Sequence, residues 1–253
     1  MKIGLLQQDI VWGKSDENRS RVQEIISHAE ECDLWVLPEM FTTGFYTMPE
    51  EVAETDQELR NYMAQLSCQC RCAIAGSAVV QEEGRYYNRF YFATPDGSIT
   101  TYDKRHLFSY GGENRHFAPG NKRVIVEYLG IRFLLQICYD LRFPVFVRNR
   151  NDYDVILYVA NWPDSRIDVW DTLLRARAIE NQCFVIGVNR CGSDGQGLVY
   201  PGHSVAIDAY GRLLTSCPPH KESVAYATID MAQLAKFRQK FPVLDDGDDF
   251  TIL

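Results

Sequence analysis

The stretch IRFLLQICYDLRFP, residues 131–144, shows how this chain is built. Its first seven residues are mostly apolar and predict a buried strand, paired as a hairpin with residues 123–128. A short helix is expected over residues 144–151. Cys138 therefore lies where a buried strand turns towards a helix.

The same alternation of strands and helices extends in both directions from this stretch. Further strands are predicted over residues 2–8, 33–38, 73–81, 86–94, 99–104, 154–160, 183–189, 204–208 and 224–229, and further helices over residues 18–31, 56–69, 167–181 and 231–240. The turn at residues 209–211 is expected to join the last two strands. This order predicts an α/β protein with helices covering sheet faces, and one domain over residues 1–253.

Composition excludes several classes of function. The 253 residues carry 26 Lys and Arg against 34 Asp and Glu, a net charge of −8, and 46% are hydrophobic, as in soluble globular proteins. Because no long basic run occurs, a nucleic-acid partner is not expected. No stretch approaches the roughly 20 apolar residues that span a bilayer, and no signal peptide is apparent, so a cytoplasmic protein is expected.

The eight cysteines are expected to be thiols in a reducing compartment. Cys68, Cys70 and Cys72 form a CxCxC pattern, which lacks the CxxC pairs of a zinc or redox site. We interpret them as a helix end running into a buried strand, and no metal site is expected.

Cys138 and Glu39 follow apolar runs and are candidates for chemistry. A thiol at a helix start, with free backbone N–H groups beside it, is placed to act as a nucleophile. A buried structural cysteine is an equally good interpretation of Cys138 from its spacing alone. Glu39, in LPEMFTTGF, is either a general base beside a thiol or a helix or loop cap.

A long loop over residues 105–122 brings two further charged residues: Lys104 lies just before it and Glu113 lies within it. Lys104, in YDKRHLF, ends a predicted strand and either stabilises an oxyanion or lies on the surface. Glu113, in GGENRHFAPG, is either a second acid or a solvated loop residue. Loops of this length in compact domains are usually functional.

Taken in order, LPEMFTTGF, YDKRHLF, GGENRHF and CYDLRFP resemble the nitrilase (carbon–nitrogen hydrolase) superfamily. CYDLRFP together with NDYDVILYVANWP is most similar to its ω-amidase branch, which includes bacterial 2-oxoglutaramate amidases. The resemblance covers nearly the whole chain. It implies an αββα sandwich, a homodimer formed through helices near the Cys138 strand, and no metal or organic cofactor.

The resemblance also implies a role for each candidate. Cys138 becomes the nucleophile and Glu39 the general base. Lys104 becomes the oxyanion donor, together with the backbone N–H of Tyr139, and Glu113 the second acid. The implied reaction cleaves the terminal amide of a small 2-oxo acid, such as 2-oxoglutaramate, through a thioester on Cys138.

The substrate-binding residues are predicted from their place in the motif loops. An aromatic wall and a carboxylate-binding arginine are expected from Phe45, Tyr110, Phe117, Trp162, Arg142 and Arg115. Core packing or a structural ion pair is an equally good interpretation of each. Three alternatives remain open for the whole chain: N-carbamoyl amino acid hydrolysis, an aliphatic nitrilase, and a binding protein without catalysis.

Overall fold

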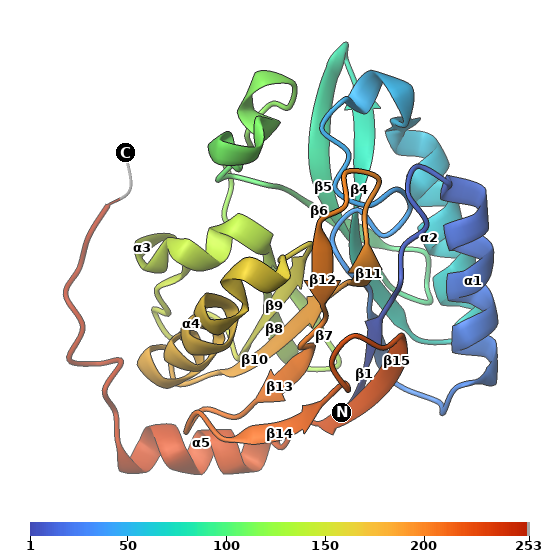
Figure 1. The fold of residues 1–253 in the computed structure, drawn as a ribbon. Helices are drawn as coiled ribbons and strands as arrows, with labels where there is room; N and C mark the ends of the chain where they lie inside the picture. The colour runs from blue at the N-terminus through green and yellow to red at the C-terminus, as the bar shows by residue number, and fades with distance from the viewer. Residues whose placement is uncertain (252–253) are drawn as a thin grey trace.

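The computed structural model describes residues 1–251 and has four layers, helix, sheet, sheet and helix (Figure 1). In the first sheet the strand order is β15-β1-β2-β4-β5-β6, with β3 beside β4. Its strands are β1 Lys2–Gln7, β2 Leu34–Val36, β3 Glu54–Thr55, β4 Ala73–Glu82, β5 Arg85–Ala93, β6 Ile99–Asp103 and β15 Ser223–Thr228. The αββα prediction is confirmed.

The second sheet has the strand order β14-β13-β10-β9-β8-β7. Its strands are β7 Ile125–Tyr128, β8 Ile131–Ile137, β9 Val155–Ala160, β10 Phe184–Asn189, β13 Val205–Ile207 and β14 Leu213–Ser216. A small hairpin, β11 Cys191–Ser193 with β12 Val199–Pro201, lies apart from both sheets. β9 is parallel to both its neighbours and buried throughout, which explains why its sequence is a continuous apolar run.

Helices cover the outer face of each sheet (Figure 1). They are α1 Ser15–His28, α2 Asp56–Cys70, α3 Pro144–Val147, α4 Ile167–Glu180 and α5 Met231–Lys240. α1 and α2 pack on the first sheet through residues such as Val22 and Met63. α4 packs so closely on β10 that a Cβ at Gly187 would lie 2.6 Å from Leu174. The shape of these layers therefore depends on a residue without a side chain at that position.

The space between the two sheets is filled by apolar side chains from both. Leu5, Val36 and Phe92 of the first sheet share one buried cluster with Phe133 and Ile137 of the second. Each such side chain contributes on the order of 1.5–3 kcal/mol when it is fully buried. The sheets therefore form one packed body, and their strand ends are fixed relative to each other.

Two of the sequence predictions are wrong. The turn at residues 209–211 joins β13 to β14, and the strand near residue 224 is β15, which pairs with β1 in the other sheet. β14 was not predicted because it is short and exposed, with Leu213 54% accessible, so it lacks the pattern of a buried strand. The helix expected over residues 144–151 ends at Val147.

Cys72 and its neighbours have the structure that the sequence predicts. Cys68 is exposed near the end of α2, and Cys72 is buried just before β4. Within residues 1–251, no group of three His, Cys, Asp or Glu side chains is arranged to hold a metal ion. Over the same residues, no helix is long and apolar enough to cross a membrane.

Candidate active site

The candidate site lies where strands of the two sheets end side by side. Glu39 follows β2, Lys104 follows β6, Cys138 follows β8 and Asn161 follows β9. Polar side chains that leave the carboxyl ends of parallel strands converge at one edge of a sheet. Here the edges of two packed sheets contribute, so residues from both halves of the chain meet.

Lys104 is the centre of a fully buried cluster of charges. Its Nζ lies 2.8 Å from Oε1 of Glu39 and 2.9 Å from Oε2 of Glu113, and all three side chains are 0% exposed. Asn88 of β5 joins the two acids, donating to Glu39 Oε1 at 2.7 Å and to Glu113 Oε1 at 3.1 Å. Buried charges are tolerated because each is paired and hydrogen-bonded.

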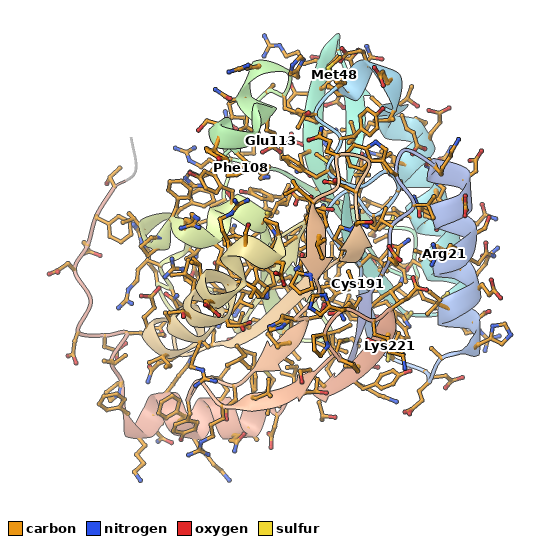
Figure 2. All side chains as sticks on the ribbon, viewed as in Figure 1. Arg21, Met48, Phe108, Glu113, Cys191 and Lys221 are labelled. Atoms are coloured by element: carbon orange, nitrogen blue, oxygen red, sulfur yellow. The ribbon has the colours of Figure 1, made fainter. Side chains whose placement is uncertain are left out.

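Glu39 is held on its other side by Asn161. The backbone N–H of Asn161 donates to Oε2 of Glu39 at 2.8 Å, and its Nδ2 donates to the Glu39 carbonyl oxygen at 2.7 Å. Glu113 likewise accepts the backbone N–H of Phe108 at 2.6 Å, and both residues lie in the segment that follows β6 (Figure 2). These contacts fix the direction in which each carboxylate points.

Cys138 lies on a sharp turn between β8 and the short 3-10 helix η4, Cys138–Arg142. Its φ of +45° is in the left-handed region, which costs a residue with a side chain about 1 kcal/mol. Buried Asp140 stabilises this turn, because it accepts the N–H of Ile137 at 2.9 Å, the hydroxyl of Tyr102 at 2.8 Å and the N–H of His106 at 3.1 Å. Strain of this kind is often found at a nucleophile.

Burial and neighbouring charges together shift the pKa values of Lys104, Glu113 and Cys138. Burial alone lowers the pKa of Lys104, but the Glu113 and Glu39 carboxylates outweigh it and hold that pKa above its ordinary value. Burial raises the pKa of Glu113, an effect that Lys104 opposes. Burial and then the Glu39 carboxylate raise the pKa of the Cys138 thiol well above its usual range. Loss of the Cys138 proton is therefore disfavoured in the resting site.

A cavity of about 450 Å³ opens above Cys138. Its lining includes Phe45, Phe108, Tyr110, Tyr139, Arg142, Asn161, Trp162, Ser165, Arg166, Asp194 and Tyr200. Arg142 and Arg166 stack on aromatic rings, at 5.3 Å from Trp162 and 5.4 Å from Phe108. Neither guanidinium is within ion-pair distance of an acidic side chain in residues 1–251. The cavity lining therefore contains a buried thiol and two arginines without ion-pair partners in the described residues.

Four of the six predicted substrate-binding residues line this cavity. They are Phe45, Tyr110, Arg142 and Trp162.

The other two predicted residues do not line this cavity. Phe117 is buried and packs with Met40 and Val79, so it supports the loop from beneath. Arg115 is exposed in the 3-10 helix η3, Glu113–Arg115, and does not line the cavity.

The sequence prediction missed three residues of the site. Asn161 follows a buried strand as Glu39 does, so the same criterion would have found it. Asn88 interrupts the apolar pattern of YYNRFYFA, and a buried polar residue inside a strand is a usable signal. Arg166 had no signal in the sequence, since it lies on a surface turn that folds back over the cavity.

Comparison with known proteins identifies the family. Residues 2–239 match the carbon–nitrogen hydrolase family. The chain is 44% identical to omega-amidase YafV of Escherichia coli (strain K12), over 100% of this chain and 98% of that protein. It is 36% identical to 2-oxoglutaramate amidase of Bacillus subtilis (strain 168), over 96% of each.

A solved structure is similar throughout. It is XC1258 from Xanthomonas campestris, a CN-hydrolase superfamily protein, with a TM-score of 0.96 and 42% identity over 100% of this chain and 98% of that one. The predicted resemblance is confirmed: the chain belongs to the carbon–nitrogen hydrolase family of the nitrilase superfamily, and it is an amidohydrolase.

Proposed function

We propose that this enzyme cleaves the terminal amide of a small 2-oxo acid, such as 2-oxoglutaramate, through a thioester on Cys138. One observation carries the proposal. The Cys138 thiol, next to the buried Glu39–Lys104–Glu113 cluster, lines a cavity whose walls also bear two arginines without ion-pair partners in residues 1–251. This arrangement fits a substrate with an amide at one end and a carboxylate at the other.

In the first half of the reaction, Cys138 Sγ attacks the amide carbon as Glu39 takes the thiol proton. The oxyanion is stabilised by Lys104 Nζ and by the backbone N–H of Tyr139, which lies in the first turn of η4, where amide groups lack intrahelical partners. The carbon–nitrogen bond then breaks as Glu39 returns the proton to the nitrogen. Ammonia leaves, and the acyl group remains on sulfur.

In the second half, a water molecule attacks the thioester carbon and Glu39 takes one of its protons. The carbon–sulfur bond breaks as the proton returns to sulfur, which releases the acid and restores Cys138. Glu113 supports both halves, because its 2.9 Å contact holds the Lys104 ammonium in place. Asn88 fixes both acids from the side away from the cavity.

Arg142 and Arg166 are proposed to hold the substrate carboxylate. A guanidinium binds a carboxylate through two parallel hydrogen bonds, and an arginine that already has an acidic partner would be less available for this. Trp162 and Phe108 orient the two groups by stacking. The names of the Escherichia coli and Bacillus subtilis relatives support an ω-amide of a 2-oxo acid as the substrate.

A substrate panel tests the activity. We expect kcat/KM for 2-oxoglutaramate to exceed that for glutamine and for an aliphatic nitrile by at least about tenfold, because only the first combines the carboxylate with the 2-oxo group. N-carbamoyl amino acids belong in the same panel. Faster turnover of the nitrile or of an N-carbamoyl amino acid would overturn the assignment.

The Cys138→Ala variant tests the covalent step. Removal of a nucleophile from such a site lowers kcat by about 10⁴-fold or more, while folding is retained. Mass spectrometry of the unmodified enzyme mixed with substrate and quenched should show the added acyl group on Cys138. Full activity in the variant would contradict the mechanism.

We also propose a homodimer. Val145 of α3 and Ile179 of α4 are 57% and 50% exposed, and a second copy would cover them. Light scattering after gel filtration measures the mass directly. A monomer at micromolar concentration would contradict this part of the proposal.

A further inference from the structure

Asn161 contains a buried polar atom that the proposed mechanism does not use. Its Oδ1 has no hydrogen-bond partner within residues 1–251, although the residue is only 6% exposed. Asn161 lines the cavity, and its backbone carbonyl oxygen lies 3.9 Å from the Cys138 sulfur. Buried polar atoms are nearly always paired, so an unpaired side-chain acceptor on a residue that lines the cavity and contacts the nucleophile through its backbone indicates that a ligand supplies the missing donor.

The orientation of this side chain is fixed by Glu39. Nδ2 of Asn161 donates to the Glu39 carbonyl oxygen at 2.7 Å and approaches Glu39 Oε2 at 3.3 Å. If the amide were flipped, its oxygen would face two other acceptors with no proton between them. Oδ1 is therefore held as an acceptor, and whatever binds it must donate.

We propose that Oδ1 of Asn161 accepts a hydrogen bond from the –NH₂ of the scissile amide, and so selects primary amides. This inference rests on the proposed function and adds a specificity-determining residue to it. The amide nitrogen is the substrate's only donor near Cys138. The same nitrogen must receive a proton from Glu39, whose Oε2 already accepts the backbone N–H of Asn161 at 2.8 Å. One residue thus positions both the proton donor and the leaving group.

Esters and nitriles lack the N–H that this acceptor requires. With either bound, Oδ1 would stay buried and unpaired, which disfavours their reaction relative to that of the amide. The proposal therefore predicts a preference for amides that resides in Asn161 and not in the buried charges.

The test compares the primary amide with the methyl ester of the same 2-oxo acid. Both form the same thioester, so the ratio of their kcat/KM values reports only the steps up to and including departure of the leaving group. In Asn161→Ala we expect the amide value to fall about 10- to 100-fold further than the ester value. Asn161→Ser retains a hydroxyl that can donate to the Glu39 carbonyl oxygen, and it replaces the alanine variant if that one does not fold.

Asn88→Ala is the matched control. Asn88 also donates to Glu39, at 2.7 Å, but it does not line the cavity. Its loss should slow the amide and the ester by the same factor. The proposal is overturned if Asn161→Ala leaves the amide-to-ester ratio unchanged, or if Asn88→Ala shifts that ratio equally.

The substrate assignment can be wrong independently of the role proposed for Asn161. If the wild-type enzyme rejects 2-oxoglutaramate but hydrolyses another linear primary amide, the substrate assignment is wrong. The ratio is then measured with that amide and its ester, and it decides the role of Asn161 in the same way.

Discussion

Two regions of the site differ in how their charges are paired. In the buried cluster, here called the inner end, Lys104 contacts two carboxylates within 2.9 Å, and all three side chains are 0% exposed. In the cavity lining, here called the outer wall, Arg142 and Arg166 contact aromatic rings and no acidic partner within residues 1–251. The inner charges already have partners, whereas the outer charges are available to a ligand.

This difference separates catalysis from selection. A cluster with its hydrogen bonds already made can stabilise a transition state without reorganising. An arginine that stacks on a ring but has no acidic partner can form new charge-assisted hydrogen bonds when an anion binds. We therefore expect substitutions at the inner end to lower both stability and kcat, and substitutions in the outer wall to change KM.

Lys104→Met should have the largest combined effect. It leaves Glu39 and Glu113 buried without their shared cation, and breaking a buried ion pair costs about 3–5 kcal/mol of unfolding free energy. We expect kcat to fall by about 10²- to 10³-fold as well, because an oxyanion donor is lost. Urea unfolding and steady-state kinetics measure the two effects. A variant with unchanged stability would show that the cluster is not held by charge pairing.

Alkylation of Cys138 tests how the buried charges act on the thiol that lines the cavity. Because burial and Glu39 raise the pKa of this thiol, the reactive thiolate remains scarce at neutral pH and increases as pH rises. We expect the iodoacetamide rate to rise about tenfold per pH unit between pH 7 and 9, without levelling off. The measurement uses a Cys68→Ser background, since Cys68 is exposed. A plateau below pH 7 would mean that the resting state is a thiolate.

Arg142→Met should raise KM for the 2-oxo acid amide by about 10- to 100-fold, which corresponds to the loss of a hydrogen bond to a charged group. Because Arg142 has no ion pair to lose, the melting temperature of the Arg142→Met variant should stay within about 2 °C of the wild-type value. Kinetics with an uncharged amide provide the control, and KM for that substrate should barely change. An equal loss for both substrates would remove Arg142 from carboxylate binding.

Arg115→Ala should have the smallest effect. This arginine is exposed outside the cavity, so kcat and KM are both expected to stay within about twofold of the wild-type values. A KM increase comparable to that of Arg142→Met would show that the loop moves Arg115 to the substrate.

The inner end could be predicted from the sequence because its residues obey one rule. Glu39 and Cys138 each follow an apolar run, Lys104 follows a strand, and strand ends meet where sheets pack. The order of the four motifs that contain these residues and Glu113 then indicated amide hydrolysis, which the spacing of the residues alone did not decide. The layers were predictable for the same reason, since buried strands such as β9 are continuous apolar runs.

The outer wall was harder to predict because it is built by chain reversals. Phe117 and Arg115 lie in the same loop as Glu113, yet the loop turns one inwards beneath Met40 and the other to the surface. Arg166 reaches the cavity from a turn after β9. Side-chain direction within an irregular segment depends on tertiary contacts, and residue type alone does not reveal it.

The left-handed conformation of Cys138 has an evolutionary consequence. Glycine adopts this φ without strain, so a Cys138→Gly chain loses catalysis but relieves about 1 kcal/mol of local strain. Selection for activity and selection for stability therefore oppose each other at this position. A lineage freed from the need to hydrolyse amides would be expected to drift towards glycine or asparagine there, while the rest of the fold persisted.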